Sequence, residues 1–170
     1  MASDRPDGET RAPMFNARII GTEDSMAVFG LVRLCYPEIE PSAWRGHLAG
    51  LGRGKRRRSG CVAVSDQRGY AHAACLFRIT PDPRSGRRLE ISYLSKAELP
   101  ASTAPDVLFA FVDQLARDED CASIVVHDSQ ARIAQDRLAT WSGIGRDLIS
   151  HHFKPGAIGF EKSVTAPAAG

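Results

Sequence analysis

Three side chains in the second half of the chain could transfer protons. Glu90 and Tyr93 lie in a segment that alternates apolar and polar residues, and His127 directly follows a short apolar run. A carboxylate or an imidazole can act as a general base, and a phenol can act as a general acid. Each also has a simpler structural explanation, which the sequence alone favours. Glu90 would be a solvated strand residue that pairs with Arg87 or Arg88, Tyr93 a core residue, and His127 the end of a strand.

The densest charge in the sequence is a glycine-rich basic stretch. It contains Arg53, Lys55, Arg56, Arg57 and Arg58. Such a run can bind phosphate, in RNA, DNA or a small phosphorylated ligand, or it can attract an acidic partner. It has no interleaved aromatic residues for base stacking, and the formal net charge of the whole chain is only +2. A solvated loop is therefore the alternative.

No group of histidines, cysteines or carboxylates has the spacing of a metal site. His151 and His152 are adjacent near a predicted helix end, where their side chains would point in different directions, and His72 is isolated in a predicted strand. The four cysteines are widely spaced and form no CxxC pair. This pattern indicates buried, reduced thiols, and it predicts a cytoplasmic protein without a metal.

Length and composition fit one domain. The chain has 170 residues, of which 43% are hydrophobic and 25% charged. No apolar run approaches the roughly 20 residues that a membrane span needs, and the polar N-terminus lacks the apolar core of a secretory signal. We therefore predict a soluble, bacterial-type domain over residues 14–164, with flexible tails at 1–13 and 165–170.

The elements that would position the candidate residues occur in an irregular order. In chain order we expect a strand at 15–20, helices at 26–35 and from 42 to 51, strands at 61–65, 70–79 and 89–99, a helix behind a capping box at 103–106, a strand at 123–127, helices at 129–139 and around 144–149, and a strand at 157–164. The three consecutive strands form an antiparallel meander. The order predicts an α+β fold with a mixed, mainly antiparallel sheet and helices on both faces.

This order of elements resembles the GNAT N-acetyltransferase superfamily over about residues 15–164. The resemblance rests on the architecture and on the closing segment HHFKPGAIGFEKSV, which is similar to the last helix, turn and strand of that family. It implies that acetyl-CoA lies where the strands 89–99 and 123–127 separate. Backbone amides at the end of the first strand would bind the pantetheine, which assigns cofactor binding to Tyr93, Leu94, Ser95 and Lys96.

The resemblance also implies a pyrophosphate loop at residues 99–106, which read LPASTAPD. Free amides and the positive end of a helix dipole favour an anion there. Ser102 and Thr103 would supply hydroxyls and amides. The loop has no glycine and departs from the family's usual Q/R-x-x-G-x-G/A pattern, Pro100 and Pro105 have no N–H, and Asp106 adds a negative charge.

Two functions are consistent with these observations. The first is acyl-CoA-dependent N-acyltransfer to a small-molecule or protein amine, with Glu90 or His127 as the base and Tyr93 as a candidate acid. The alternative is a non-catalytic GNAT-like module that binds a protein or nucleic acid through the basic stretch. The apolar first helix could pack inside the domain or form the face of a homodimer.

Overall fold

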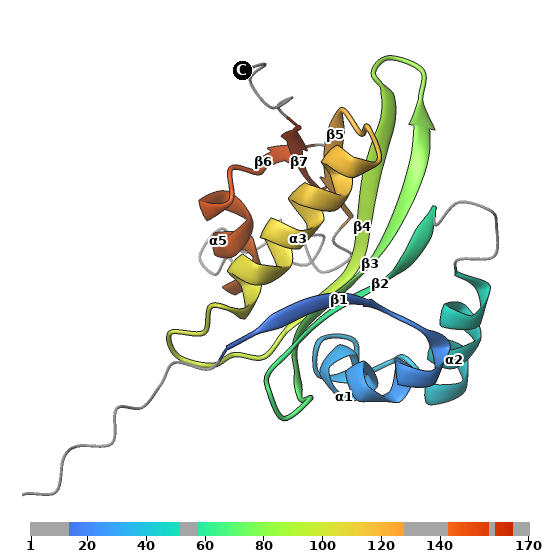
Figure 1. The fold of residues 1–170 in the computed structure, drawn as a ribbon, viewed down its shortest axis with the longest axis vertical. Helices are drawn as coiled ribbons and strands as arrows, with labels where there is room; N and C mark the ends of the chain where they lie inside the picture. The colour runs from blue at the N-terminus through green and yellow to red at the C-terminus, as the bar shows by residue number, and fades with distance from the viewer. Residues whose placement is uncertain (1–13, 52–57, 128–142, 157–158, 165–170) are drawn as a thin grey trace, which may run out of the picture.

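A seven-stranded sheet in the order β1-β2-β3-β4-β5-β7-β6 forms the centre of the protein (Figure 1). The computed structural model describes residues 14–51, 58–127, 143–156 and 159–164. The strands are β1 (Asn16–Ile20), β2 (Ser59–Ser65), β3 (Ala71–Asp82), β4 (Gly86–Lys96), β5 (Ser123–Val126), β6 (Lys154–Gly156) and β7 (Gly159–Ser163). Only the β4–β5 pairing is parallel among these strands. The predicted mixed, mainly antiparallel sheet is confirmed.

Helices cover both faces of the sheet, as predicted. They are a short 3-10 helix η1 (Thr22–Asp24), α1 (Ser25–Cys35), α2 (Pro41–Gly50), α3 (Ala104–Asp118) and α5 (Gly143–Ser150). The apolar side of α1, which includes Val28 and Val32, packs on one face with Trp44 of α2. Leu108 and Val112 of α3 pack on the other face. Burial of these helix faces and of both sheet faces supplies the main driving force for the fold.

The strand ends differ from the sequence-based prediction in three places. The turn between β3 and β4 spans only residues 83–85, whereas the predicted strands left residues 80–88 between them. The Asp82 carboxylate stabilises this short turn by accepting a hydrogen bond from the Arg84 amide, and Gly86 takes a positive φ of 95°. β4 ends at Lys96 rather than at residue 99. The predicted last strand at 157–164 is instead the short hairpin of β6 and β7. The helix predicted at 129–139 lies outside the described residues.

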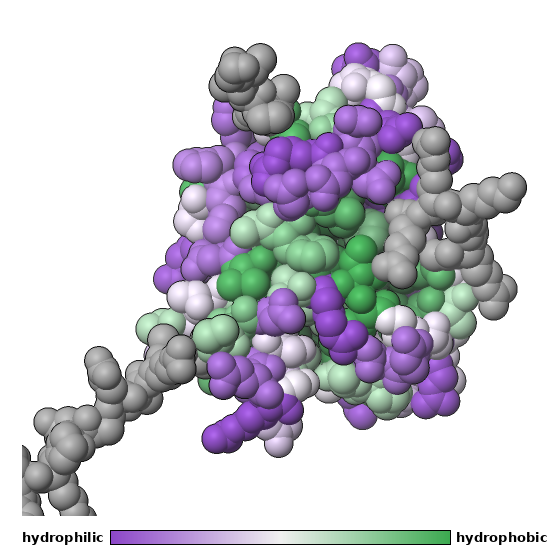
Figure 2. All heavy atoms as spheres, in the orientation of Figure 1, coloured by the Kyte–Doolittle hydropathy of each residue, from purple (hydrophilic) through white to green (hydrophobic). Residues whose placement is uncertain are grey.

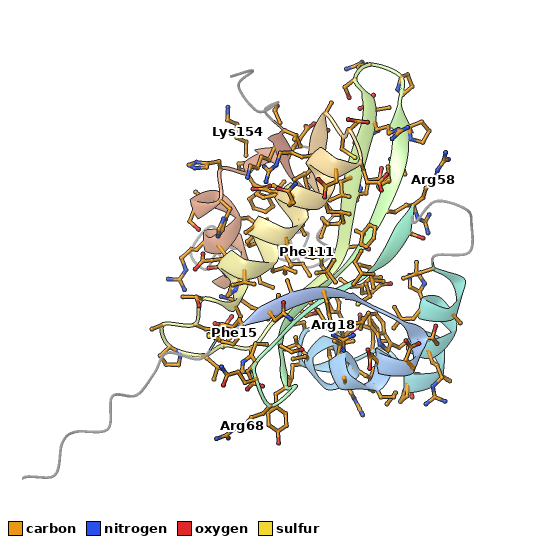
Figure 3. The ribbon with its side chains drawn as sticks, in the orientation of Figure 1. Phe15, Arg18, Arg58, Arg68, Phe111 and Lys154 are labelled. Atoms are coloured by element: carbon orange, nitrogen blue, oxygen red, sulfur yellow. The ribbon has the colours of Figure 1, made fainter. Side chains whose placement is uncertain are left out.

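The first helix packs inside the domain, which answers one of the questions that the sequence left open. Its buried residues join the core between α1, α2 and the sheet. On the other face, Figure 2 shows apolar side chains gathered between α3 and β1. Phe15, Ala17 and Ile19 of this region are only partly buried, and so is Phe111 of α3, which Figure 3 labels. These side chains extend the core to the edge of the sheet.

Candidate functional site

The parallel strands β4 and β5 pair for only a short distance and then separate. Their register runs from Arg88 opposite Ser123 to Ile91 opposite Val126, and the His127 amide donates to the Ile91 carbonyl over 2.8 Å. β4 continues to Lys96, whereas β5 ends at Val126. Within the described part of the chain, residues 92–96 of β4 therefore have a paired strand on one side only.

A bulge marks the point where the two strands separate. Ser92 lies opposite Leu76 and Ser95 opposite Ala74, so two residues of β4, Tyr93 and Leu94, lie opposite the single residue Cys75. An extra residue of this kind bends its strand and redirects backbone groups. Beyond the bulge, the Ala97 amide donates to the His72 carbonyl of β3, so alternation turns the peptide N–H of Lys96 away from β3.

Tyr93 takes a conformation that a bulky residue rarely adopts. Its φ is +51°, in the left-handed region, which costs on the order of 1–3 kcal/mol. Neighbouring aromatic rings hold it in place: the rings of Tyr36, Trp44 and His47 meet the Tyr93 ring edge-on at centroid distances of 5.3, 6.2 and 5.9 Å. The Tyr36 hydroxyl also donates to the Leu94 carbonyl over 3.5 Å. The surrounding helices thus fix the shape of the bulge.

The structure brings Glu90 and His127 together beside the strand opening. The His127 Nε2 atom lies 3.8 Å from Glu90 Oε2, and the Thr80 hydroxyl donates to Glu90 Oε1 over 3.0 Å. Arg88 Nε lies 3.6 Å from Glu90 Oε1. Both side chains of the pair remain within reach of solvent, with 27% of Glu90 and 38% of His127 exposed. A carboxylate positioned by a hydroxyl and beside an imidazole can accept a proton.

The simpler structural explanations that the sequence offered for Glu90 and Tyr93 also hold in part. Glu90 does contact Arg88, as the structural explanation expected, whereas Arg87 donates instead to the Glu119 carbonyl over 2.9 Å. The ring contacts of Tyr93 are with Tyr36, which follows α1, and with two aromatic rings of α2, and not with Glu90 or His127. Glu90 and His127 therefore lie together at the strand opening, and Tyr93 belongs to the neighbouring aromatic cluster.

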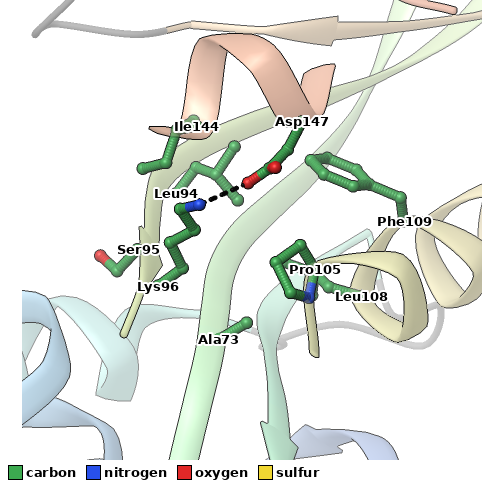
Figure 4. A pocket seen from close by; sticks show the side chains of 9 residues that line it. All are labelled: Ala73, Leu94, Ser95, Lys96, Pro105, Leu108, Phe109, Ile144 and Asp147. Carbon is green, nitrogen blue, oxygen red and sulfur yellow. Dashed lines mark ion pairs between the residues drawn. The ribbon is translucent and has the colours of Figure 1, made fainter. Parts of the chain in front are cut away.

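The remaining β4 residues predicted to bind a cofactor line a small pocket on the α3 side of the sheet. Figure 4 shows the Leu94 and Lys96 side chains facing residues of α3 and α5, whereas the Ser95 hydroxyl points away from them. The Lys96 ammonium lies 2.7 Å from a carboxylate oxygen of Asp147 on α5, and this ion pair crosses the pocket. The volume is only about 10 Å³, about enough for one water molecule. The sequence did not point to Asp147, because its partner Lys96 is about 50 residues away in the chain and no periodic pattern links the two.

The start of α3 is capped by its own chain. Thr103 is the N-cap residue, but its side chain makes no capping hydrogen bond, so the predicted capping box at 103–106 is wrong. The Ser102 hydroxyl instead accepts a hydrogen bond from the Ala104 amide over 3.3 Å. In the first turn, Asp106 Oδ1 lies 2.8 Å from His151 Nε2 of the segment after α5. Sequence patterns also missed this contact.

A third carboxylate–imidazole pair joins Asp66 of the β2–β3 turn to His72 of β3. Asp66 accepts hydrogen bonds from the Arg68 and Tyr70 amides, and its other oxygen lies 3.1 Å from His72 Nε2. Partial desolvation raises the pKa of Asp66, but the bonds from His72 and the two amides outweigh it and lower this pKa below its ordinary 3.8. The turn therefore depends on an ionised Asp66.

We expect Asp66→Asn to destabilise the protein at neutral pH. Because the native state lowers the pKa of Asp66, the ionised carboxylate contributes stability above the ordinary carboxyl range, and this contribution disappears as pH falls through the native pKa. Thermal unfolding from pH 7 down to pH 3 should show the wild type and the variant converging below about pH 4. The exposed Glu38→Gln variant is the control, and a constant difference between wild type and Asp66→Asn would contradict this account.

The other sequence candidates are less informative. Among the described residues no group of three or more His, Cys, Asp or Glu could hold a metal ion, and no helix is long and apolar enough to cross a membrane. Cys61, Cys75 and Cys121 are buried free thiols, and burial raises the pKa of Cys61 to about 12. Of the basic stretch, only Arg58 is described. It is exposed and extends away from the sheet (Figure 3).

Strand opening, bulge and flanking helices together define the GNAT N-acetyltransferase fold, and solved structures of that class match this chain over most of its length. A probable acetyltransferase from Staphylococcus epidermidis ATCC 12228 matches with a TM-score of 0.64 and 11% identity, covering 89% of this chain and 100% of that one. An aminoglycoside N-acetyltransferase in complex with CoA matches with a TM-score of 0.61 and 12% identity, covering 78% of this chain and 97% of that one.

A third match shows the breadth of substrates among these structures. It is a ribosomal-protein-alanine N-acetyltransferase from Brucella melitensis biovar Abortus 2308, with a TM-score of 0.53 and 12% identity, covering 76% of this chain and 96% of that one. No protein-family model matches the sequence, and the search of curated proteins found no match. The comparisons therefore establish a GNAT-like fold.

Proposed function

We propose that the protein is an N-acyltransferase that transfers an acyl group from a pantetheine thioester, of the CoA type, to an amine. The observation that carries this proposal is the strand opening itself. One edge of β4 beyond Ile91 has no paired strand among the described residues, and Glu90 and His127 lie beside the point where the opening begins. The GNAT-like fold supports the same function, because most proteins with that fold are N-acetyltransferases that use acetyl-CoA.

The residues at the opening fit the pantetheine part of such a donor. Pantetheine is an extended arm with two amide groups, and an unpaired strand edge offers backbone donors and acceptors to a ligand of that kind. The bulge at Tyr93 and Leu94 would aim backbone groups of β4 at the thioester carbonyl, where oriented N–H groups stabilise developing negative charge. Leu94 and Lys96 are thus proposed as the residues that bind the arm, with Ser95 buried beneath them.

The residues at the start of α3 do not fit the pyrophosphate part. Ser102 caps the helix, and Pro105 has no N–H. Asp106 places a carboxylate in the first turn. We therefore assign no phosphate-binding role to Ser102 and Thr103.

The donor, when bound, supplies an acyl group activated as a thioester. The acceptor nitrogen forms a bond to the acyl carbon, the carbon–sulfur bond breaks, and the sulfur leaves as a thiolate. The proton that the amine loses passes to Glu90, whose Oε1 atom accepts a hydrogen bond from Thr80 and whose Oε2 atom lies 3.8 Å from His127 Nε2. Tyr93 shapes the strand in this scheme.

A direct assay is release of free thiol from acetyl-CoA in the presence of a panel of amines. The panel should include aminoglycosides, amino sugars and peptides with a free N-terminus, because the similar structures include N-acetyltransferases of an aminoglycoside, of glucosamine-6-phosphate and of ribosomal-protein alanine. We expect at least one amine class to raise thiol release well above the rate without protein. Amine-independent background with every class would argue for the non-catalytic alternative, whose proposed basic surface, apart from Arg58, lies outside the described residues.

A further inference from the structure

We propose that this protein recognises its donor through the acyl-pantetheine arm and not through the phosphates of CoA, so that acyl-pantetheine thioesters are substrates whatever group they carry at the far end. This inference rests on the proposed function and names its donor class. It follows from three observations around the start of α3: the use of its amides, the charge of its surroundings, and the position of α5.

Several backbone amides at this helix start are already in use. The Ala104 amide donates to the Ser102 hydroxyl, and the Ser102 amide donates to the Leu99 carbonyl. The Val107 amide makes the first i→i−4 bond of α3, to the Thr103 carbonyl. Pro105 has no N–H to donate. An anion binds a helix N-terminus through its first free amides, so a phosphate here would lack a donor at Pro105 and would have to displace the Ser102 hydroxyl to reach the Ala104 amide.

The side chains that contact one another here carry more negative than positive charge. Lys96 lies 2.7 Å from Asp147 and 3.8 Å from Glu98, and Asp106 lies 2.8 Å from His151. Even with a protonated imidazole, three carboxylates face two cations. A pyrophosphate would therefore meet net repulsion, and Lys96 could bind it only by leaving Asp147.

Helix α5 packs against the start of α3 and leaves little space there for a ligand. Ile144 and Asp147 of α5 lie against Pro105 and Phe109 of α3 across the small pocket (Figure 4), and the Phe109 ring also packs on the His151 ring at 4.7 Å. Leu94 and Lys96 of β4 also line this pocket, but the backbone edge of β4 from residue 92 to 96 has no paired strand on its β5 side among the described residues. The arm and the acyl group can thus be held where the strands separate, whereas the phosphates would lie beyond α5 and the start of α3.

Calorimetric titration with three donors tests the inference: acetyl-CoA, S-acetyl-4′-phosphopantetheine and S-acetylpantetheine. We expect the three dissociation constants to agree within about tenfold. Acetyl-CoA that binds more than a hundredfold more tightly than S-acetylpantetheine would overturn the inference and leave the proposed function intact. Absence of binding by all three would overturn the proposed function and the inference with it.

Removal of the carboxylate at the helix start gives a second test. Asp106 is 63% exposed, so Asp106→Asn should fold normally. We expect it to tighten binding of acetyl-CoA several-fold while leaving S-acetylpantetheine unchanged, because only the first ligand brings phosphates near this position. Asp118→Asn, an exposed carboxylate at the other end of α3, is the matched control. Equal effects of Asp106→Asn on both ligands would contradict the charge argument.

Discussion

Glu90→Gln is expected to lower amine-dependent acyl transfer by about 10²-fold or more while leaving donor binding unchanged. The amide keeps the size of the carboxylate and can still accept the hydrogen bond from the Thr80 hydroxyl, but it cannot take a proton from the amine. General-base catalysis of this kind contributes about 10²–10⁴-fold in rate. The loss should therefore appear in kcat, measured as thiol release with whichever amine supports turnover.

Glu161→Gln is the matched control for that experiment. Val125 lies opposite both Glu90 and Glu161 in the register, so the two glutamates share a face of the sheet, and Glu161 is exposed. We expect the control to keep the wild-type rate. A Glu90→Gln variant with an unchanged rate would contradict the role of Glu90. A much larger loss in His127→Gln than in Glu90→Gln would assign the proton to the imidazole instead.

Gly159→Ala is expected to destabilise the fold by several kcal/mol, because β7 approaches β5 too closely for a side chain. A Cβ atom at Gly159 would lie in steric conflict with the Val126 carbonyl oxygen, and the φ of +150° also disfavours any L side chain. A loss of about 3 kcal/mol would lower the melting temperature by about 6–12 °C in a protein of this size. The conflict falls on the peptide directly before His127, so His127 should be displaced from Glu90 as well.

Gly69→Ala separates the steric part of this effect from the conformational part. Gly69 also has a positive φ, of +85°, but a Cβ atom there would meet nothing within 4 Å. We expect it to cost only about 1–2 kcal/mol, the ordinary penalty of a left-handed residue. Equal losses of stability in the two variants, measured by thermal unfolding, would show that the close approach of β7 to β5 adds nothing to the cost of a side chain at position 159.

Much of the fold could be predicted from local patterns in the sequence. Alternating apolar residues identified β4, runs bounded by turn residues identified β2 and β3, and the apolar stripe with Leu108 and Val112 identified α3. Strand ends were less predictable, because they depend on single interactions such as the Asp82 bond to the Arg84 amide. The short β6–β7 hairpin was predicted as one strand, since no local pattern reveals the close approach of Gly159 to β5.

The candidate site was only partly predictable. Glu90 and His127 were selected by residue type and by their places on neighbouring strands, and the structure brings them within 3.8 Å. The bulge at Tyr93 has no sequence signature, because an aromatic residue is disfavoured in the left-handed region and is held there by distant rings. The ion pairs of Asp147 and His151 join segments far apart in the chain, which no periodicity reveals.

Amide hydrogen exchange with and without acetyl-CoA tests the central claim most directly, because it observes the open edge of β4 itself. If the strand opening binds the thioester donor, saturating acetyl-CoA should slow exchange within residues 92–96, and most clearly at Lys96, whose N–H points away from β3. The same protection should be seen in Glu90→Gln, which binds the donor without transferring the acyl group. Unchanged exchange across residues 92–96 at millimolar acetyl-CoA would contradict the account.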